Sequence, residues 1–242
     1  MDVKNLKDPG NKLFNRSKNE ILQNNTKSAV EQVINCRSFM RSEETHNIVQ
    51  SVSKCVDFVT KHISDVLNLN FSSTLSGSFA ENTKCFAPDE FDFVLDCKTN
   101  LQFGEQSNFS LKVYACIDSL TRRNVFNHET KTGLLKLVSF LFGDKISCLS
   151  LIWLSNTNER LDITVDLAVC YKGEVIKIPR VFKNTHGSVK KTYHLIEQQM
   201  LGKLPKHIRD GFILAKAVRI ASIATPTNIQ SFELQETIKL MI

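Results

Sequence analysis

Two stretches of alternating apolar and polar residues carry the acidic side chains that are best placed for chemistry. In the first stretch, Glu90 and Asp92 are two positions apart, so in a β-strand both carboxylates would project from one face. In the second stretch, 161–167, Asp166 follows the same alternation. If the two strands lie side by side, Asp166 joins Glu90 and Asp92 in a cluster of three carboxylates.

Such a cluster is unfavourable without a cation, because neighbouring negative charges raise one another's pKa. Oxygen ligands of this kind suit Mg²⁺ or Mn²⁺. Two such ions about 3.5–4 Å apart stabilise the attacking and the leaving oxygen of a phosphoryl or nucleotidyl transfer. We therefore expect two Mg²⁺ or Mn²⁺ ions, held by Glu90, Asp92 and Asp166.

The pair Gly77-Ser78 offers a means of holding phosphate. Gly77 permits a tight turn from a strand into a helix, where backbone N–H groups bind phosphate, and the Ser78 hydroxyl can donate to a phosphate oxygen. Each feature is common alone, and a Glu-x-Asp pair in a strand is most often only a solvated edge. The ordered set of Gly-Ser, Glu-x-Asp between aromatic residues and a distant Val-Asp is typical of polymerase-beta-like nucleotidyltransferases.

Four segments of the sequence also resemble a known family. They are 77–81 (Gly-Ser-Phe-Ala-Glu), 87–92 (Ala-Pro-Asp-Glu-Phe-Asp), 163–167 (Ile-Thr-Val-Asp-Leu) and 209–219 (Arg-Asp-Gly-Phe-Ile-Leu-Ala-Lys-Ala-Val-Arg). In this order they are similar to the animal cyclic GMP-AMP synthase-like receptors and Mab-twenty-one proteins. The resemblance implies a bilobed enzyme whose active site lies between a nucleotidyltransferase lobe and a helical lobe.

The resemblance implies that Lys216 reaches the donor triphosphate from the helical lobe. On a helix, Lys216 is expected to lie with Arg209 and Arg219 on one broad face. This face would be opposite a stripe made by Ile208 and Phe212, an arrangement that suits an anion clamp. The alternative for these cations is a solvated charged face.

Other contacts to the nucleotides follow from the same resemblance. The three carboxylates named above are the implied metal ligands, and Ser78 is implied to contact the triphosphate. Ser231 would touch phosphate, with the ring of the following residue stacked on a base. Lys190 falls where the family often has an Arg-x-Ser that reads the base.

The reaction that the resemblance implies joins ATP and GTP into a cyclic dinucleotide, which acts on a STING-type receptor in innate immune signalling. No cysteine lies between His186 and Lys216, so the zinc ribbon of cyclic GMP-AMP synthase is not visible and we expect no zinc. Double-stranded RNA is then the expected activator rather than DNA, because zinc-less relatives sense RNA by its shape and phosphates. The alternatives are an idle Mab-twenty-one-type binding or developmental protein, a truncated family member, and a nucleotidyltransferase that acts on a nucleic acid or a protein.

The elements that must position these residues follow an α+β order. Ser42 can cap a long helix whose apolar stripe extends to Val66. Strands are expected at 91–96, 111–115, 146–154 and 161–167, and further helices at 29–34, 134–142, 192–201, 206–223 and 232–242.

This order predicts a polymerase-beta-like nucleotidyltransferase lobe, made of a mixed sheet with helices, followed by a helical lobe that looks truncated. The expected parts are a basic, mobile arm over 1–38, the nucleotidyltransferase core over 39–179, and the start of the helical lobe over 180–242.

The composition agrees with a reduced compartment and an anionic partner. The chain has 242 residues and a net charge of +6, which suits a polyanion such as a nucleic acid. Its seven cysteines are widely spaced without a CxxC pair, which indicates free thiols. No apolar run is long enough to span a membrane, and the N-terminus lacks the apolar region of a secretory signal. We expect no membrane partner and a cytoplasmic location, with the nucleus as the alternative.

Overall fold

The computed structural model describes residues 29–100, 109–123, 126–142, 147–171, 174–175 and 205–221. The described strands form one mixed sheet in the order β1-β2-β6-β5-β4-β3, with β7 beside β6. The strands are β1 (Phe71–Ser76), β2 (Glu90–Cys97), β3 (Asn127–Glu129), β4 (Gly133–Phe142), β5 (Ser147–Ser155), β6 (Arg160–Tyr171) and β7 (Glu174–Val175). The described helices are α2 (Ala29–Cys36), α3 (Glu43–Leu67), α4 (Gly77–Ala80), α5 (Phe109–Thr121) and α7 (Lys206–Ala221), with the 3₁₀ turn η2 at Ser38–Arg41.

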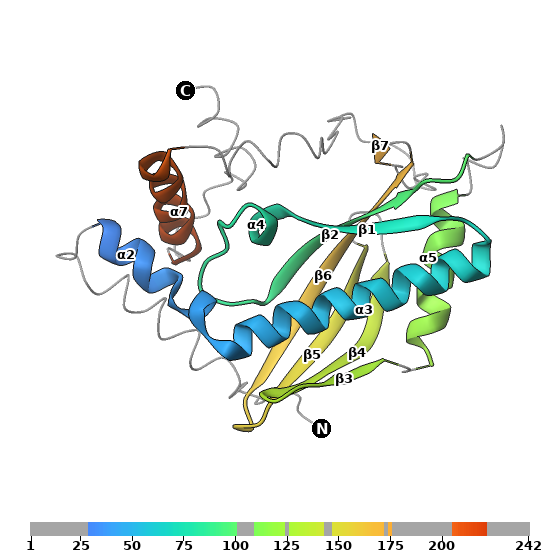
Figure 1. The fold of residues 1–242 in the computed structure, drawn as a ribbon, viewed down its shortest axis with the longest axis horizontal. Coiled ribbons are helices and arrows are strands. Elements are labelled where there is room, and N and C mark those ends of the chain that lie inside the picture. Colours follow the sequence, from blue (N-terminus) through green and yellow to red (C-terminus); the bar gives the residue numbers. More distant parts are fainter. Residues whose placement is uncertain are drawn as a thin grey trace, which may run out of the picture.

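The strands β2 and β6 form the one parallel pair among the described strands. They come from distant parts of the sequence, yet they lie side by side in the sheet (Figure 1). Side chains of register partners in such a pair lie on the same face of the sheet. The pairing can therefore gather side chains from both strands at one place.

The long helix α3 forms for the reasons visible in its sequence. The Ser42 Oγ accepts the backbone N–H of Thr45 at 3.0 Å, which satisfies one of the free donors of the first turn. Asn68, in the left-handed conformation, ends the helix. Figure 1 shows α3 lying across one face of the sheet, with α5 near its C-terminal end.

The main core lies between this face of the sheet and the helices α3 and α5. Strand β6 is buried at every second residue over 161–167, which leaves the intervening side chains on the opposite face. Burial of each large apolar side chain contributes roughly 1.5–3 kcal/mol to stability. The core includes Val52, Val56 and Ile63 of α3, Phe91, Phe93 and Leu95 of β2, Leu149 and Leu151 of β5, and Ile163, Val165 and Leu167 of β6.

A second, smaller cluster of buried residues joins α2, the loop before β2 and α7. We call it the second cluster; it consists of Val33, Cys36, Cys85, Phe86, Ile213 and Ala217, with Leu214 packed against it. Figure 1 shows α2 and α7 next to each other, apart from the helices that cover the main core. The helix α2 falls within 1–38, the range expected to form an arm, and it packs on α7 through this cluster.

The prediction of a helix at 134–142 is wrong, because this stretch is strand β4. Leu135 and Leu137 are buried, whereas Val138 and Leu141 are exposed, and the strand pairs with β5. A short run rich in apolar residues fits both the helical and the strand periodicity, so the sequence alone does not decide between a helix and a strand.

The prediction of a strand at 111–115 is also wrong, because this stretch lies inside α5. Val113, Ile117 and Leu120 are buried at helical spacing and pack into the main core. The five residues that suggested a strand were too few to show that spacing.

The other predicted elements that fall on described residues are confirmed. The strands expected at 91–96, 146–154 and 161–167 correspond to β2, β5 and β6, and the helices expected at 29–34 and 206–223 correspond to α2 and α7. The helices expected at 192–201 and 232–242 lie outside the described residues. Within the described part of the chain, no helix combines the length and the apolar character that crossing a membrane requires.

Candidate active site

The parallel pair of β2 and β6 brings the predicted carboxylates together. Asp92 is the register partner of Asp166, and Glu90 is the register partner of Thr164. All of these side chains lie on the sheet face opposite the main core, because the residues between them turn inward. The strands of Glu90, Asp92 and Asp166 are therefore neighbours, as the clustering of these carboxylates requires.

The turn after β1 closes directly over Asp92. Ser76, the last residue of β1, is the register partner of Asp92, and Gly77 follows with a φ of +61°. A Cβ at position 77 would overlap Oδ2 of Asp92 and lie 2.6 Å from its Cγ. Glycine is therefore required here both by the backbone conformation and by the close approach of the carboxylate.

The loop that follows this turn folds back on Ser78. The carbonyl oxygen of Ser78 accepts the backbone N–H of Thr83 at 2.8 Å and that of Lys84 at 3.0 Å. The ring of Phe79 stacks on that of Phe91, with 4.3 Å between centroids, and this contact fixes α4 to β2. The loop thus fixes the backbone of Ser78 and places the side chain of Lys84 beside the start of β2.

Lys84 is a residue of the site that the sequence reasoning missed. The residue is only 6% exposed, and its Nζ lies 2.9 Å from Oδ1 of Asp89 and 3.2 Å from Oε2 of Glu90. Burial of an ammonium group is costly unless carboxylates pair with it, so this lysine belongs to the acidic cluster. The available signal was a single lysine between the Gly-Ser pair and the Glu-x-Asp pair.

The electrostatics of the cluster favour a bound cation. Burial, followed by repulsion from Glu90 and Asp166, raises the pKa of Asp92 to about 6, although Lys84 and Lys216 act in the opposite direction. Burial, with a contribution from Glu90, also raises the pKa of Asp166. The two lysines therefore compensate only part of the repulsion between the carboxylates.

The predicted position of Lys216 on a face opposite Phe212 is wrong. Lys216 follows Phe212 by four residues and Ile213 by three, so it lies between two fully buried positions on the inner side of α7. Burial lowers its pKa, and its charge interacts with those of Lys84 and Glu90. The alternative of a solvated charged face is also wrong for Lys216, which faces the acidic cluster from α7.

The remaining predicted nucleotide contacts are not located. Lys190 and Ser231 lie outside the described residues, and so does the side chain of Arg219. Arg209 is partly buried in the first turns of α7.

The donor chemistry of the cluster fits Mg²⁺ or Mn²⁺, since its ligands are carboxylate oxygens, and burial and neighbouring charge raise the pKa of Asp92 and of Asp166. The described residues nevertheless contain no group of three or more His, Cys, Asp or Glu side chains placed to hold an ion. The carboxylate of Glu90 pairs with the Lys84 ammonium group at 3.2 Å.

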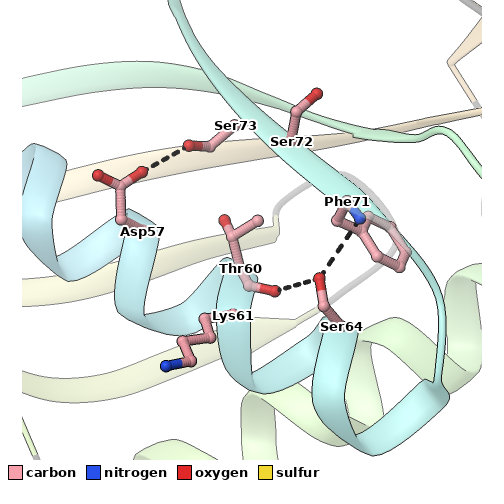
Figure 2. A pocket seen from close by; sticks show the side chains of 7 residues that line it. All are labelled: Asp57, Thr60, Lys61, Ser64, Phe71, Ser72 and Ser73. Atoms are coloured by element: carbon pink, nitrogen blue, oxygen red, sulfur yellow. Dashed lines mark hydrogen bonds between the residues drawn. The ribbon is translucent and has the colours of Figure 1, made fainter.

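A separate polar pocket lies between α3 and β1, at the end of β1 far from Gly77 (Figure 2). Within it, Ser73 Oγ donates to Asp57 Oδ1 at 2.8 Å, and Ser64 Oγ donates to the carbonyl oxygen of Thr60 at 2.9 Å. None of the predicted site residues lines this pocket, so it is distinct from the candidate active site. It has a volume of about 440 Å³ and is lined by Asp57, Thr60, Lys61, Ser64, Phe71, Ser72 and Ser73.

Comparisons with known proteins bear on the fold. No protein-family model and no curated protein matches the sequence. Among solved structures, the chain is similar to a STING-associated CdnE c-di-GMP synthase from Capnocytophaga granulosa, with a TM-score of 0.50 and 9% identity, over 93% of this chain and 68% of that chain. It is also similar to the DncV cyclic AMP-GMP synthase of Vibrio cholerae, with a TM-score of 0.39 and 15% identity, over 95% of this chain and 61% of that chain.

The similarity to the Capnocytophaga granulosa synthase concerns the fold, because the identity is only 9%. The chain spans about two thirds of the length of the matched proteins, 68% and 61% respectively. The mixed sheet with the parallel β2–β6 pair and its covering helices matches that architecture. The chain therefore has the polymerase-beta-like nucleotidyltransferase fold that its sequence predicted.

Proposed function

We propose that this chain is a metal-dependent nucleotidyltransferase that joins ATP and GTP into a cyclic dinucleotide in response to double-stranded RNA. The observation that carries the proposal is the juxtaposition of Asp92 and Asp166 as register partners, with the Gly77 turn closed directly over Asp92. A solvated acidic edge has no need of a glycine packed against one of its carboxylates. The fold and the sequence resemblance supply the reaction class.

In the proposed reaction, side chains of the loop and of α7 bind the donor triphosphate. The Ser78 hydroxyl would donate to a phosphate oxygen, and Lys216 would pair with the triphosphate from the opposite side. An ammonium group that is partly withdrawn from water attracts phosphate more strongly than a fully solvated one. Lys190 and Ser231 would add contacts to the base and to phosphate.

The three carboxylates would serve as metal ligands. Glu90, Asp92 and Asp166 would hold two Mg²⁺ or Mn²⁺ ions, which when bound stabilise negative charge on the attacking ribose oxygen and on the leaving pyrophosphate. Lys84 pairs with Glu90 at 3.2 Å, so an ion bound to Glu90 would displace its ammonium group. The released Lys84 would then be close enough to Lys216 to share the binding of phosphate.

The activator and the receptor of the product belong to the same proposal. A net charge of +6 supports binding of a polyanion, and the lack of a recognisable zinc ribbon supports RNA over DNA. The cyclic product would act on a STING-type receptor in the cytoplasm. The structurally similar synthase from Capnocytophaga granulosa is itself described as STING-associated.

A second candidate is an idle family member that binds nucleic acid or a protein without catalysis. Lys84 favours it, because its ammonium group pairs with both Asp89 and Glu90. An acidic cluster whose charge is partly compensated by an internal lysine has less need of a divalent cation.

The test is an incubation of the chain with labelled ATP and GTP, Mg²⁺ or Mn²⁺, and either long double-stranded RNA or long double-stranded DNA. The proposal predicts a phosphatase-resistant product with RNA that is absent from a Glu90→Ala/Asp92→Ala variant. A product that needs DNA would overturn the proposed activator and leave the enzyme class intact. Absence of product with every nucleic acid would contradict the enzyme class and favour the idle protein.

A further inference from the structure

Two cysteine thiols meet inside the second cluster, away from the acidic residues. Cys36 is the last residue of α2, and Cys85 lies in the loop before β2; they are 0% and 4% exposed. The Cys36 thiol donates to the carbonyl oxygen of Val33 at 3.2 Å, and the Cys85 thiol donates to that of Thr83 at 3.5 Å. The two thiols are close enough to shift each other's pKa. The backbone N–H of Phe86 also donates to the carbonyl oxygen of Cys36 at 2.7 Å, so the two chain segments are in direct contact at this point.

The surroundings of the pair distinguish Cys85 from Cys36. The interaction with Cys36 and the nearby charges of Lys216 and Arg37 lower the pKa of Cys85, against the effect of burial. The interaction with Cys85, together with burial, raises the pKa of Cys36. The pKa of Cys85 therefore lies below that of Cys36, which makes Cys85 the more nucleophilic of the two sulfurs.

The other cysteines of the chain do not have a lowered pKa. All seven lie among the described residues and are buried, and burial raises the pKa of the five thiols outside this pair. They are Cys55, Cys97, Cys116, Cys148 and Cys170, and the pKa of Cys55 is raised to about 12. A thiol, unlike a thiolate, is a poor nucleophile.

The loop next to Cys85 is strained. Phe86 has a φ of +69°, and the backbone N–H of Ala87 donates to the carbonyl oxygen of Cys85 at 2.9 Å. This is a γ-turn of the kind with a positive φ at its centre, which is rare and costs roughly 1–3 kcal/mol for a residue with a Cβ. Cys36 helps to hold the strained turn in place through the hydrogen bond from Phe86.

We infer that Cys36 and Cys85 are a redox-modified site, at which a reversible disulfide bond forms between the end of α2 and the loop before β2. The inference rests on the burial of both cysteines in the second cluster and on the direct contact between their chain segments. It does not depend on the proposed nucleotidyl transfer. The oxidant is a hydroperoxide.

The chemistry requires two steps. The Cys85 thiolate attacks one oxygen of the hydroperoxide and breaks the O–O bond; the departing oxygen takes up a proton, and Cys85 becomes a sulfenic acid. The sulfur of Cys36 then attacks the sulfenic sulfur, and the hydroxyl group leaves with the Cys36 proton as water. Two electrons pass from the two thiols to the hydroperoxide, and each oxygen ends in water or alcohol.

The disulfide would change the mobility of the loop. It would fasten α2 covalently to the segment that holds Lys84 beside Glu90, in addition to the hydrogen bond that Arg37 donates to Asn82. A disulfide bond between Cys36 and Cys85 would close the chain segment between them into a loop. Closing such a loop stabilises a protein mainly by restricting its unfolded state. Oxidation should therefore raise the thermal midpoint of the chain and restrict release of Lys84.

The test is peptide mapping by mass spectrometry of the full chain after treatment with hydrogen peroxide and alkylation of the remaining thiols. The inference predicts one linked peptide pair containing Cys36 and Cys85, lighter by two hydrogen atoms and restored by dithiothreitol. In the matched control Cys55→Ser, the same pair should form at an unchanged rate. In Cys36→Ser, Cys85 should instead accumulate as a sulfenic acid that reacts with dimedone, more than about tenfold faster than any other cysteine.

A linked pair in the folded chain together with the dimedone adduct at Cys85 supports the inference. Oxidation of Cys85 without a link to Cys36 would overturn it, as would random pairing among the seven cysteines. If Cys36→Ser fails to fold, the linked pair in the unmodified chain and its absence from Cys85→Ser decide the question. Each of these outcomes is independent of whether the chain makes a cyclic dinucleotide.

Discussion

The two buried regions of this molecule position side chains of opposite charge. The main core, between the sheet and the helices α3 and α5, fixes the strands that carry Asp92 and Asp166. The second cluster, between α2, the loop before β2 and α7, holds the lysines Lys84 and Lys216. The acidic half of the candidate site thus rests on a large core, and the cationic half rests on a small one.

The difference indicates which half of the site can move. Opening of the main core would expose many large side chains at once, whereas the second cluster contains six buried residues and a strained turn. The carboxylates are therefore expected to stay in place while the lysines change position when a cation or a triphosphate binds. The predictions below test this contrast.

The largest effects should come from cavities in the two regions. Leu149→Ala in the main core should lower the free energy of unfolding of the whole chain by about 2–5 kcal/mol. Leu149 is fully buried, so the substitution removes apolar contacts and leaves a cavity. Ile213→Ala, also at 0% exposure, should mainly increase hydrogen exchange in α2, α7 and the loop before β2. Hydrogen exchange measured by mass spectrometry checks both. Equal loss of protection across the sheet in Ile213→Ala would show that the two regions unfold as one unit.

The next effect concerns the glycine at the turn over Asp92. Gly77→Ala should destabilise the chain by roughly 3 kcal/mol, because the added Cβ has an unfavourable φ and displaces the carboxylate of Asp92. Gly211→Ala is the matched control, since a Cβ at this helical position meets nothing within 4 Å, and it should stabilise the chain by about 0.5–1 kcal/mol. Urea unfolding measures both changes. A Gly77→Ala variant as stable as the parent would contradict the close packing at the site.

The charge of Asp92 should make the site a source of instability. Its pKa in the folded state is about 6, above its ordinary value of 3.8, so folding disfavours the ionised form. The penalty is absent at pH values below the ordinary pKa, and it grows as the pH rises through the folded pKa. At neutral pH it reaches roughly 1–3 kcal/mol.

The variant Asp92→Asn removes this penalty with little change in the volume of the side chain. It should therefore raise the thermal midpoint at neutral pH but not near pH 4, measured by differential scanning calorimetry. Asp162→Asn, which removes an exposed partner of Arg160, is the control and should have no such pH-dependent effect. A lower midpoint for Asp92→Asn at neutral pH would show that its charge is already fully compensated.

The smallest effect concerns the lysine that partly compensates this charge. Lys84→Met should raise the pKa of Asp92 further, because one of the two cations that lower it is removed. Lys206→Met, which removes an exposed partner of Asp210 on α7, should leave the pKa of Asp92 unchanged. Carboxyl ¹³C chemical shifts followed against pH give the pKa directly. An unchanged pKa in Lys84→Met would mean that Lys84 does not belong to the acidic cluster.

The acidic half could be predicted from the sequence because its signal is local. Alternation of apolar and polar residues in 161–167 and at the start of 91–96 identifies strands and the face that each side chain takes, and α3 shows its cap and its stripe. The pairing of β2 with β6 does not follow from this alternation, since two alternating strands do not reveal their neighbours. The resemblance to a known family made that pairing an expectation.

The cationic half could not be predicted in the same way. Lys84 is placed by a loop that folds back on the carbonyl of Ser78 and passes through a strained turn at Phe86, and neither feature follows from composition. On α7, Ile208, Phe212 and Lys216 follow one another at intervals of four residues, so helical spacing places Lys216 beside the buried Phe212 and not opposite it. The expected position of Lys216 is therefore wrong on helical spacing alone, whereas its proximity to the acidic cluster depends on how α7 packs.

The most direct test of the account compares two aspartates of the same strand and face. Asp166 is the register partner of Asp92, whereas Asp162 lies four residues earlier and pairs with Arg160 at 2.7 Å. Pyrophosphate release from ATP and GTP should be measured with Mn²⁺ and double-stranded RNA for the parent, Asp166→Asn and Asp162→Asn. The account predicts a loss of at least about a hundredfold for Asp166→Asn, equivalent to about 2.7 kcal/mol, and near-parental release for Asp162→Asn. Equal release from the parent and Asp166→Asn would contradict the assignment of the active site to the β2–β6 pair.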